Sequence, residues 1–558
     1  QVYLSFDAVY EHVETIFLVE HVAEREGQTQ KWGPTPMPLG PALDADFPQV
    51  ERAVRVDRMP GIVYRGRNAF DELVSFADVG FFGMFTFPLQ YGSPEARADP
   101  NAVILSREAA TRYFGTDNPV GRTLRIAMGD SGPESYTVQG VAEPFPANAG
   151  FDFEVLLSFD RRLALASSRS GDWAVFAGAT FVQVSQPGDV EVIAGAMDRY
   201  RALHNAANEN RTITSFLFDN LHDPAFDAYT VRQRLVEAPH PVFIGMMVAV
   251  ALVLMALACF NYINIAFGAA SRRLREIGVR KAMGGTQRQL VFQFLAENVL
   301  LCALALLVGL VLVQTVLVPF FNDLFVLQID LSFTQNLELW GFLIGLLAVV
   351  AVASGAYPAF YIASFEPTAI FRGKQKLERK KWYTHAFLTG QFVLAFLAVI
   401  IGVLLALNGR YMANLDWGYS ADQTLVVRLT DAEQFARLRD DALQRSSVEH
   451  VAGARNHVGT SRSAVVVRTG EQKKEAFQYE VGPGYFEAAG LRVKSGRVFD
   501  ARRGSETNSA VVVNEAFARM QGWDNPIGKT IRAEETTYQV VGVVSDFLHN
   551  VIEGARPV

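Results

Sequence analysis

The pattern of apolar and polar residues divides the chain into three regions. Residues 1–240 and 409–558 alternate short β-branched runs with charged residues and Gly/Pro turns, which is typical of soluble α/β domains. The middle region holds four long apolar runs, at residues 242–267, 290–319, 340–363 and 385–407. A run of about 20 apolar residues is long enough to cross a bilayer as a helix. The pattern therefore predicts four membrane helices between two soluble regions.

The charges beside these runs predict their orientation. The loop after the first run and the loop after the third are rich in Lys and Arg, whereas the loop after the second has none. The basic residues are Arg272, Arg273, Arg275, Arg280, Lys281 and Arg288 in the first loop, and Arg372, Lys374, Lys376, Arg379, Lys380 and Lys381 in the other. Because basic loops stay on the cytoplasmic side, both soluble regions are expected outside the cytoplasm.

The first basic loop, SRRLREIGVRKAMGG, has sequence features beyond its positive charge. Leu274 and Ile277 form a short apolar face among basic residues, and the two glycines at the end stop a helix. Thr286 and Gln289 then match a capping box that opens the next helix. We therefore expect a short amphipathic helix along the cytoplasmic face, joined to two membrane helices and able to take a push from a docked partner. The simpler alternative is an ordinary positive-inside loop.

An internal repeat links the two soluble regions. NAVILSREAATRYFGTDNPVGRTLRI from Asn101 matches NSAVVVNEAFARMQGWDNPIGKTIRA from Asn508 without gaps, and YTVQGVA at Tyr136 matches YQVVGVV at Tyr538. Each copy predicts a strand, a short helix, a glycine cap, an Asn-Pro turn, a strand, a hairpin and a strand. About 100 residues follow the first copy before the membrane region and about 14 follow the second. We expect further chain, with more membrane helices, after residue 558, and a signal or membrane helix before residue 1.

Local patterns predict individual elements of the first soluble region. Strands are expected at Ala102–Leu105, Tyr136–Val141 and Ala179–Val184, and helices at Asp7–Glu24 and Val190–His204. In the third apolar run, Gly341 and Gly345 are spaced for close helix packing, with ordinary membrane glycines as the alternative. Ser354, Gly355 and Pro358 predict a kink or a helix stop near its inner end.

The candidate chemistry is sparse. The net charge of −7 predicts no nucleic-acid partner, and Cys259 and Cys302 both fall in apolar runs. The nine histidines show no metal-ligand spacing. Gly528–Thr530 reads GKT, but the spacing from Gly522 is one residue too long for a phosphate loop. We therefore predict no catalytic, cofactor or metal site in this chain.

Several motifs together resemble the FtsX/MacB-type permeases of ATP-binding cassette (ABC) systems. They are REIGVRKAMGG with QLVFQFLAEN, the Asn-Pro-Ile-Gly-Lys-Thr-Ile-Arg repeat with YQVVGVVSDF, SGAYPAFYIASFEP, the TGQFVLAFLAVIIGVLLALNGRYMANLDWGY segment and YLSFDAVYEHVETIFLVE. The resemblance covers nearly the whole chain. Within the family, the chain is most similar to the subgroup with two fused permease halves. Gly285, where the family usually has alanine, is a departure.

The resemblance implies a multi-pass α-helical membrane bundle with two homologous α+β extracytoplasmic domains in the bacterial inner membrane. The implied domains are 1–240, the first periplasmic core; 241–320, two membrane helices with a coupling helix at 268–285; 321–339, a periplasmic loop; 340–363, a membrane helix; 364–384, a cytoplasmic linker; 385–408, a membrane helix; and 409–558, the second periplasmic core.

The resemblance also implies how the chain works. A dimeric cytoplasmic ATPase, carrying ATP and Mg, docks on the coupling helix, and its closure moves the membrane helices and the outer domains. The matching residues are Arg275, Glu276, Ile277, Gly278, Arg280, Lys281, Ala282 and Gly284. We add Glu297 to this set, because a charged residue inside a membrane helix is costly and is therefore a candidate functional residue. The alternative is that Glu297 lies at the membrane interface.

The resemblance leaves the function open in several respects. Peptides, drugs, lipids and lipoproteins are all family substrates, and the need for an adaptor or an outer-membrane channel stays open. One alternative function is a sensor or mechanotransmission permease that moves no substrate. A membrane-anchored enzyme is a further alternative, disfavoured because the sequence shows no nucleophile or metal set.

Overall fold

The computed structural model of the chain consists of two compact units. A helical unit covers Pro239–Ala413, and the other unit contains Gln1–Ala238 and Asn414–Val558, which we call the first lobe and the second lobe. Structure is described for residues 10–25, 28–93, 99–115, 118–129, 132–145, 149–165, 171–208, 211–222, 230–235, 241–324, 337–364, 381–420, 422, 424–429, 432–460, 463–470, 472–499, 509–533, 536–549 and 558. Most of the expected linker 364–384 and of the loop 321–339 lies outside these residues.

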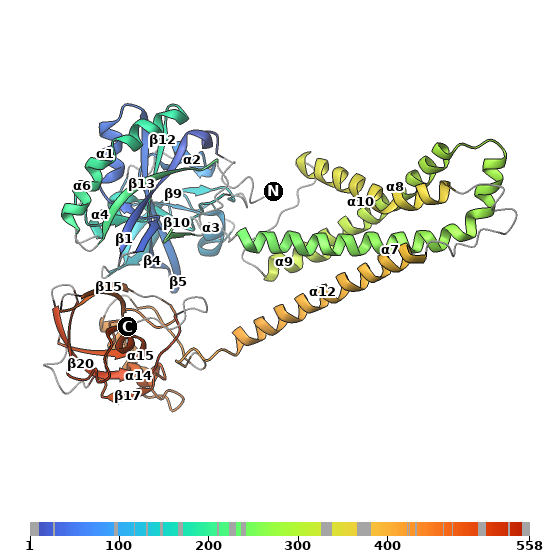
Figure 1. Cartoon of the computed structure of the whole chain (residues 1–558). Coiled ribbons are helices and arrows are strands. Elements are labelled where there is room, and N and C mark those ends of the chain that lie inside the picture. Colours follow the sequence, from blue (N-terminus) through green and yellow to red (C-terminus); the bar gives the residue numbers. More distant parts are fainter. Residues whose placement is uncertain are drawn as a thin grey trace. The chain divides into compact units, whose positions relative to one another are not determined.

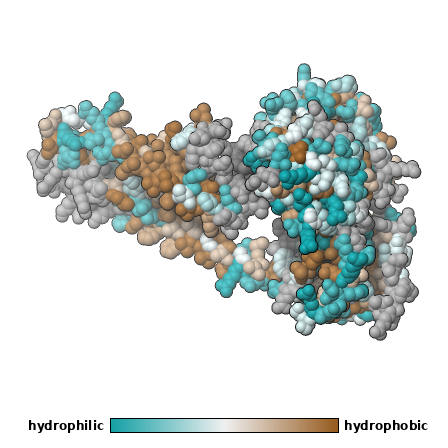
Figure 2. Space-filling view, turned by 180° about the vertical axis from the view of Figure 1, so that it is seen from behind, coloured by the Kyte–Doolittle hydropathy of each residue, from teal (hydrophilic) through white to brown (hydrophobic). Residues whose placement is uncertain are grey.

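The helical unit contains four candidate membrane spans among the described residues, as the apolar pattern predicts. They are Gly245–Ala266, Gln287–Asn322, Leu339–Tyr361 and Leu388–Ala413. Apolar side chains cover much of the surface of this unit (Figure 2), which suits a lipid environment. The helices are α7 (Pro241–Ala282), α8 (Gln287–Leu312), the π-helical segment η5 (Val313–Leu317), α9 (Val318–Leu324), α10 (Leu337–Ala363) and α12 (Lys381–Ala413) (Figure 1).

The boundaries of the first span differ from the sequence prediction. We expected a membrane helix ending at Phe267 and a separate short helix after it, but α7 is one continuous helix from Pro241 to Ala282. Gly268 directly follows Phe267, but a single glycine only weakens a helix. No proline and no second glycine occur before Gly278, so the helix continues through the basic segment. The ribbon of α7 bends near its C-terminal end (Figure 1). The basic segment is therefore an extension of a membrane helix.

The first lobe contains a 12-stranded sheet among its described residues. Its order is β14-β2-β1-β12-β4-β5-β10-β7-β9-β6, with β13 paired to β1, and β8 paired to β4 and β9. The strands of this sheet are β1 (Ile16–Arg25), β2 (Gln28–Trp32), β4 (Val50–Arg65), β5 (Asn68–Ala77), β6 (Leu89–Gly92), β7 (Ala102–Leu105), β8 (Thr123–Met128), β9 (Glu134–Ala142), β10 (Val155–Ser158), β12 (Ala179–Val184), β13 (Thr212–Asn220) and β14 (Val231–Arg232). The short strands β3 (Thr35–Pro36) and β11 (Phe176–Ala177) pair with each other in a separate two-stranded sheet.

Short helices cover the sheet of the first lobe. They are η1 (Val13–Thr15), α1 (Leu39–Asp46), α2 (Phe81–Phe85), α3 (Arg107–Phe114), α4 (Phe159–Leu165), η3 (Pro187–Asp189), α5 (Val190–Gly195) and α6 (Asp198–Ala207). The three predicted strands are confirmed as β7, β9 and β12, and the helix predicted at Val190–His204 is confirmed as α5 and α6 with a short break between them.

The helix predicted at Asp7–Glu24 is wrong over its described part. Residues from Ile16 form β1, which pairs with β13 along one edge and with β12 and then β2 along the other. Phe17, Leu18 and Val19 are all buried, because apolar layers cover both faces of this strand. A short apolar run buried on both faces shows no strand alternation, and so its period is not diagnostic.

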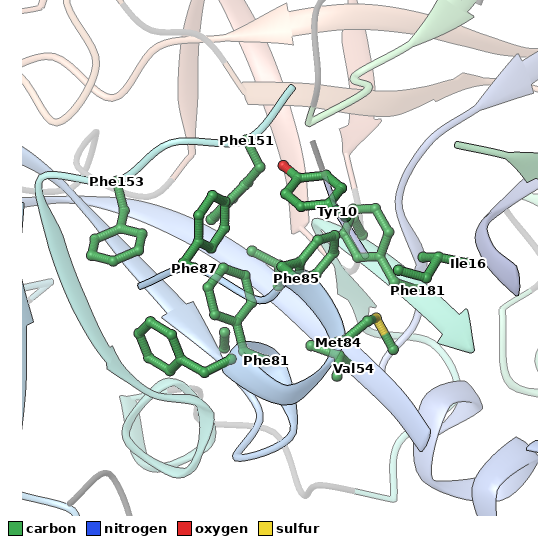
Figure 3. Packing of buried hydrophobic residues seen from close by; sticks show 14 of the residues in the cluster. Tyr10, Ile16, Val54, Phe81, Met84, Phe85, Phe87, Phe151, Phe153 and Phe181 are labelled. Carbon is green, nitrogen blue, oxygen red and sulfur yellow. The ribbon is translucent and has the colours of Figure 1, made fainter. Parts of the chain in front are cut away.

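Three buried apolar clusters hold the described part of the first lobe together. The first is rich in phenylalanine, and Figure 3 shows the rings of Phe85, Phe87 and Tyr10 close together. Phe85 meets Phe181 of β12 edge to face, with ring centroids 5.0 Å apart, which is a favourable geometry for aromatic pairs. The second cluster packs α3 against the sheet. The third packs α1, α5 and α6 against β1, β12 and β13.

The second lobe contains a six-stranded sheet among its described residues, in the order β16-β15-β19-β20-β17, with β18 paired to β20. Its strands are β15 (Ser463–Thr469), β16 (Gln472–Gln478), β17 (Val493–Gly496), β18 (Ala510–Asn514), β19 (Thr530–Ala533) and β20 (Thr536–Val544). Its helices are α13 (Ala432–Ala442), α14 (Tyr485–Ala488) and α15 (Glu515–Gln521).

The strand pairings of the two lobes confirm the internal repeat. β7 runs parallel to β9 as β18 runs parallel to β20, and β8 and β6 pair with β9 as β19 and β17 pair with β20. Each parallel pair carries a register shift after its second residue. Ser106 caps α3 and Asn514 caps α15 through the backbone N–H three residues on. Gly115 and Gly522 end these helices with positive φ.

The gapless alignment of the repeat needs one correction. The strand pairing aligns Ala102 with Ala510, and the helix caps align Ser106 with Asn514. The glycines that end the helices, Gly115 and Gly522, are separated by one residue fewer along the chain than these pairs. The difference arises because α3 has eight residues and α15 has seven. The first copy therefore carries one extra residue in its helix, which identity between the sequences does not reveal.

Candidate functional site: the coupling elbow and its membrane helix junction

Two hydrogen bonds close the turn at residues 283–286, and we use the name elbow for this turn together with the last two turns of α7 and the first turn of α8. Gly284, with φ +97°, donates its N–H to the Lys281 carbonyl at 3.1 Å, and Gly285 donates to the Arg280 carbonyl at 2.9 Å. These two bonds form a Schellman ending, which satisfies carbonyls that a helix end leaves open. A Cβ atom at Gly285 would lie 2.9 Å from the Arg280 carbonyl oxygen, so glycine suits this position better than the alanine common in relatives.

The next helix begins immediately after the turn. The Thr286 hydroxyl accepts a hydrogen bond from the Gln289 N–H, and the Gln289 side chain accepts one from the Thr286 N–H. This reciprocal pair is the predicted capping box, and it is confirmed. The backbone groups at the end of α7 and at the start of α8 are hydrogen-bonded within four residues. The two helices are therefore joined by a short, hydrogen-bonded turn.

The last two turns of α7 present two different faces. Glu276, Val279, Arg280 and Met283 follow helical spacing and are all exposed, with Met283 83% exposed. Arg280 pairs with Glu276 at 2.7 Å and donates to Gln293 of α8 at 2.6 Å, and both members of the ion pair are about half exposed. We call these four residues the outer face of the elbow.

The opposite face packs against the other helices of the unit. Ile277 is 3% exposed and lies in an apolar cluster with Leu290 and Val291 of α8 and Ala359 and Ala363 of α10. The Lys281 ammonium donates a hydrogen bond to the Ala363 carbonyl at 2.5 Å. A cation beside the last carbonyls of a helix interacts favourably with the helix dipole. Lys281 therefore caps α10.

The predicted coupling residues are thus divided between two faces. Glu276 and Arg280 lie on the outer face, whereas Ile277 and Gly278 are buried and Lys281 faces α10. Ala282 and Gly284 are exposed at the turn, and the side chain of Arg275 lies outside the described residues. Glu297 is partly buried and accepts a hydrogen bond from Gln293 at 3.1 Å. The described members of the set thus lie along the end of α7, at the turn and in the first three turns of α8.

A buried polar contact joins α8 to α10 deeper in the unit. Asn298, 1% exposed, donates to the Ala351 carbonyl at 2.6 Å and to the Ser354 hydroxyl at 3.1 Å. A Cβ atom at Gly355 would overlap the Asn298 amide. Among the described residues, no atom lies within 4 Å of a Cβ position on Gly341 or Gly345, whereas Gly355 is in close contact with α8. The sequence signal for Asn298 is a polar residue within an apolar run.

A second amide pair joins α7 to α12. Asn264 donates to the Gln391 side-chain oxygen at 3.1 Å, and the ring of Phe260 lies 3.5 Å from a Cβ position on Gly390. Side-chain hydrogen bonds between membrane helices contribute about 1 kcal/mol each. Polar side chains of the described residues therefore join α7 to α12 as well as α8 to α10.

Two histidines of the first lobe are buried in its core. Among the described residues, no group of three or more His, Cys, Asp or Glu could hold a metal ion. His21 of β1 is fully buried and stacked on Phe176, and this burial lowers its pKa to about 3. His204 is also buried, with its ring nitrogens on the Trp173 and Arg211 carbonyls.

Comparison with known proteins identifies the class. The model of the MacB-like periplasmic core domain matches residues 6–200 and 392–554, which is more than half of the chain. The model of the FtsX-like permease C-terminal region matches residues 248–367, which contain the elbow. The chain therefore belongs to the FtsX/MacB-type ABC transporter permeases, a membrane protein family with periplasmic domains.

Curated relatives are ATP-binding/permease proteins of export systems. The chain is 33% identical over 88 residues to the macrolide export protein MacB of Aggregatibacter actinomycetemcomitans, covering 16% of this chain and 14% of MacB. It is 23% identical over 329 residues to the pyoverdine export protein PvdT of Pseudomonas syringae pv. tomato, covering 58% and 46%. The chain thus spans less than half the length of these relatives.

Solved structures of permease domains are similar to part of the chain. A domain of a permease protein from Porphyromonas gingivalis matches with a TM-score of 0.33 and 18% identity, covering 42% of this chain and 97% of that one. The periplasmic region of MacB from Actinobacillus actinomycetemcomitans matches with a TM-score of 0.28 and 14% identity, covering 37% and 89%. The family assignment rests on the sequence matches alone.

Proposed function

We propose that this chain is the permease component that couples ATP hydrolysis by a separate dimeric ATPase to movement of the lobes. The observation that carries the proposal is the two-sided elbow. Its outer face leaves Val279, Arg280 and Met283 open to a partner, while its inner face is fixed to α8 and α10. A part with one free face and one anchored face passes a displacement on to the helices that anchor it. ATP and Mg would bind the ATPase partner.

The proposed location is the bacterial inner membrane, with the lobes in the periplasm and the elbow in the cytoplasm. The basic residues around the elbow support this orientation. Protease added to intact spheroplasts should cleave the lobes and leave the elbow whole, because only one side of the membrane is exposed. Cleavage at the elbow in intact spheroplasts would contradict this topology.

The outer face predicts how ATPase docking can be broken. Replacing the exposed Val279 and Met283 with Asp should lower co-purification of the ATPase about tenfold or more, because docking would bury two charges in an apolar contact. Leu443→Asp is the matched control, since Leu443 is 50% exposed on the second lobe. Undiminished co-purification by the elbow variant would refute the docking assignment.

The proposed cargo is a peptide, drug, lipid or lipoprotein that the lobes export or extract. The named functions of the relatives, macrolide and pyoverdine export, support an exporter. ATP-dependent movement of one of these cargo classes out of cells or into inverted vesicles would support this function. ATPase stimulation without any movement of cargo would instead favour a sensor permease. An adaptor or an outer-membrane channel would appear as a co-purifying protein that needs the lobes and not the elbow.

A further inference from the structure

The inner end of α10 has a built-in weak point. Pro358 lies inside the helix, and a proline has no N–H to donate to the carbonyl four residues earlier, that of Ser354. The Ser354 hydroxyl donates to the Val350 carbonyl at 2.7 Å, a bond that tends to bend a helix. Gly355, between these two residues, adds backbone freedom. An isolated helix of this sequence would therefore bend most easily around residues 354–358.

Both sides of this weak point are tied to helices of the elbow. On the outer side, the Asn298 amide of α8 donates to the Ala351 carbonyl and the Ser354 hydroxyl. On the inner side, Ile277 of α7 packs on Ala359 and Ala363, and Lys281 donates to the Ala363 carbonyl. The Asn298 contacts lie in an apolar unit, where an unpaired amide is costly, so the clamp resists separation.

We propose that Asn298 and Lys281 are positioning residues that clamp α10 across its Pro358 hinge, so that α10 follows every displacement of the elbow. This inference rests on the proposed function and makes it specific. The ATPase displaces the elbow at its outer face. Lys281 and Ile277 transmit this displacement to the inner end of α10, and Asn298 prevents the neighbouring turn of α10 from bending away. Without the clamp, the push would be absorbed as a bend at residues 354–358.

The first test needs no ATPase. In the full-length protein in lipid nanodiscs, with Cys259 and Cys302 replaced by Ser, spin labels at the exposed positions Leu301 of α8 and Phe360 of α10 report the distance across the hinge. The wild-type background should give one narrow distance distribution. Asn298→Ala and, independently, Lys281→Met should broaden it, and Lys281→Arg should restore it. A distribution as narrow in both variants as in the background would overturn the clamp.

The second test adds the partner ATPase. Asn298→Ala should still bind the ATPase, while permease-stimulated ATP turnover falls about tenfold and the KM for ATP stays within about twofold, because only the transmission is lost. Leu304→Ala, at an exposed position of α8, is the control and should leave turnover unchanged. Turnover at the wild-type level in Asn298→Ala would overturn the clamp and leave docking intact. If the outer-face variants bind normally, docking is refuted, and the clamp is still judged by the spin-label distances.

Discussion

The two lobes share one repeated unit but differ in what surrounds it. In the first lobe, β1, β12 and β13 extend the sheet, and α1, α5 and α6 cover it to form a third apolar cluster. The described residues of the second lobe form two clusters, which match the first two of the first lobe. Its helix α13 precedes a hairpin as α1 does, yet it buries no residue, and Leu425 just before it is 86% exposed.

This difference shows that the repeated unit carries its own cores. Both lobes form the same capped helix and the same parallel strand pair, although only the first lobe has the third cluster. The side-chain cap and the register shift are also the same in both. Each repeat buries its helix against its own parallel strand pair, so most of its apolar contacts are local in sequence. The third cluster is a separate layer that depends on strands distant along the chain.

The largest expected effect tests the third cluster directly. Leu43→Ala in α1 removes a fully buried side chain and should destabilise the first lobe by about 3 kcal/mol. Leu438→Ala in α13, where the side chain is 41% exposed, should cost less than about 0.5 kcal/mol. Hydrogen exchange of the strands in each lobe, followed by mass spectrometry of the full chain, reports both values. Equal losses in the two lobes would contradict the comparison.

An acid-sensitivity test probes the same layer through His21. Burial, together with the charge of Arg211 and the neighbouring His204, lowers the pKa of His21 from 6.5 to about 3. Below pH 6.5 the unfolded chain takes up a proton that the folded lobe does not, so stability falls as pH falls, by about 1.4 kcal/mol per unit down to about pH 3. Between pH 6.5 and 5 the first lobe should lose about 2 kcal/mol from this group.

His21→Phe is the matched variant for this test, because it keeps an aromatic ring beside Phe176. It should remove that part of the pH dependence from the hydrogen exchange of β1 and leave the exchange of the second lobe unchanged. An acid response of β1 that persists in full would show that other groups titrate there.

The smallest expected effect tests what the lobes share. Ser106→Ala and Asn514→Ala each remove a helix cap and should each cost about 1 kcal/mol in their own lobe. Asn514→Ser, which keeps a capping oxygen, should cost much less. Hydrogen exchange of α3 and α15 measures the effect. A large loss in one lobe and none in the other would show that the two caps are not equivalent.

The local sequence pattern is sufficient to predict many of the secondary-structure elements of this molecule. The apolar runs predicted four spans, the capping box at Thr286 was readable from two residues, and β7 and β12 were predicted with their observed bounds. These features depend on residues close together in the chain. The repeat predicted two related lobes because helix caps and turns require particular residue types at particular positions.

Other features required the folded chain. Residues from Ile16 form a strand because β12 and β13, more than 150 residues later, cover it. The basic residues of the elbow look alike in sequence, but Arg280 lies on the outer face while Lys281 caps α10. Asn298 is one amide in an apolar run until Gly355 is brought against it.

The sequence by itself thus determined the membrane helices, the caps and turns, and the repeated unit, since each depends on interactions within about one or two turns or strands. Only the tertiary structure decided which face of the elbow is free, which residues clamp α10, and which lobe carries a third core. These depend on pairings between residues far apart in the chain, and such pairings leave no local periodicity.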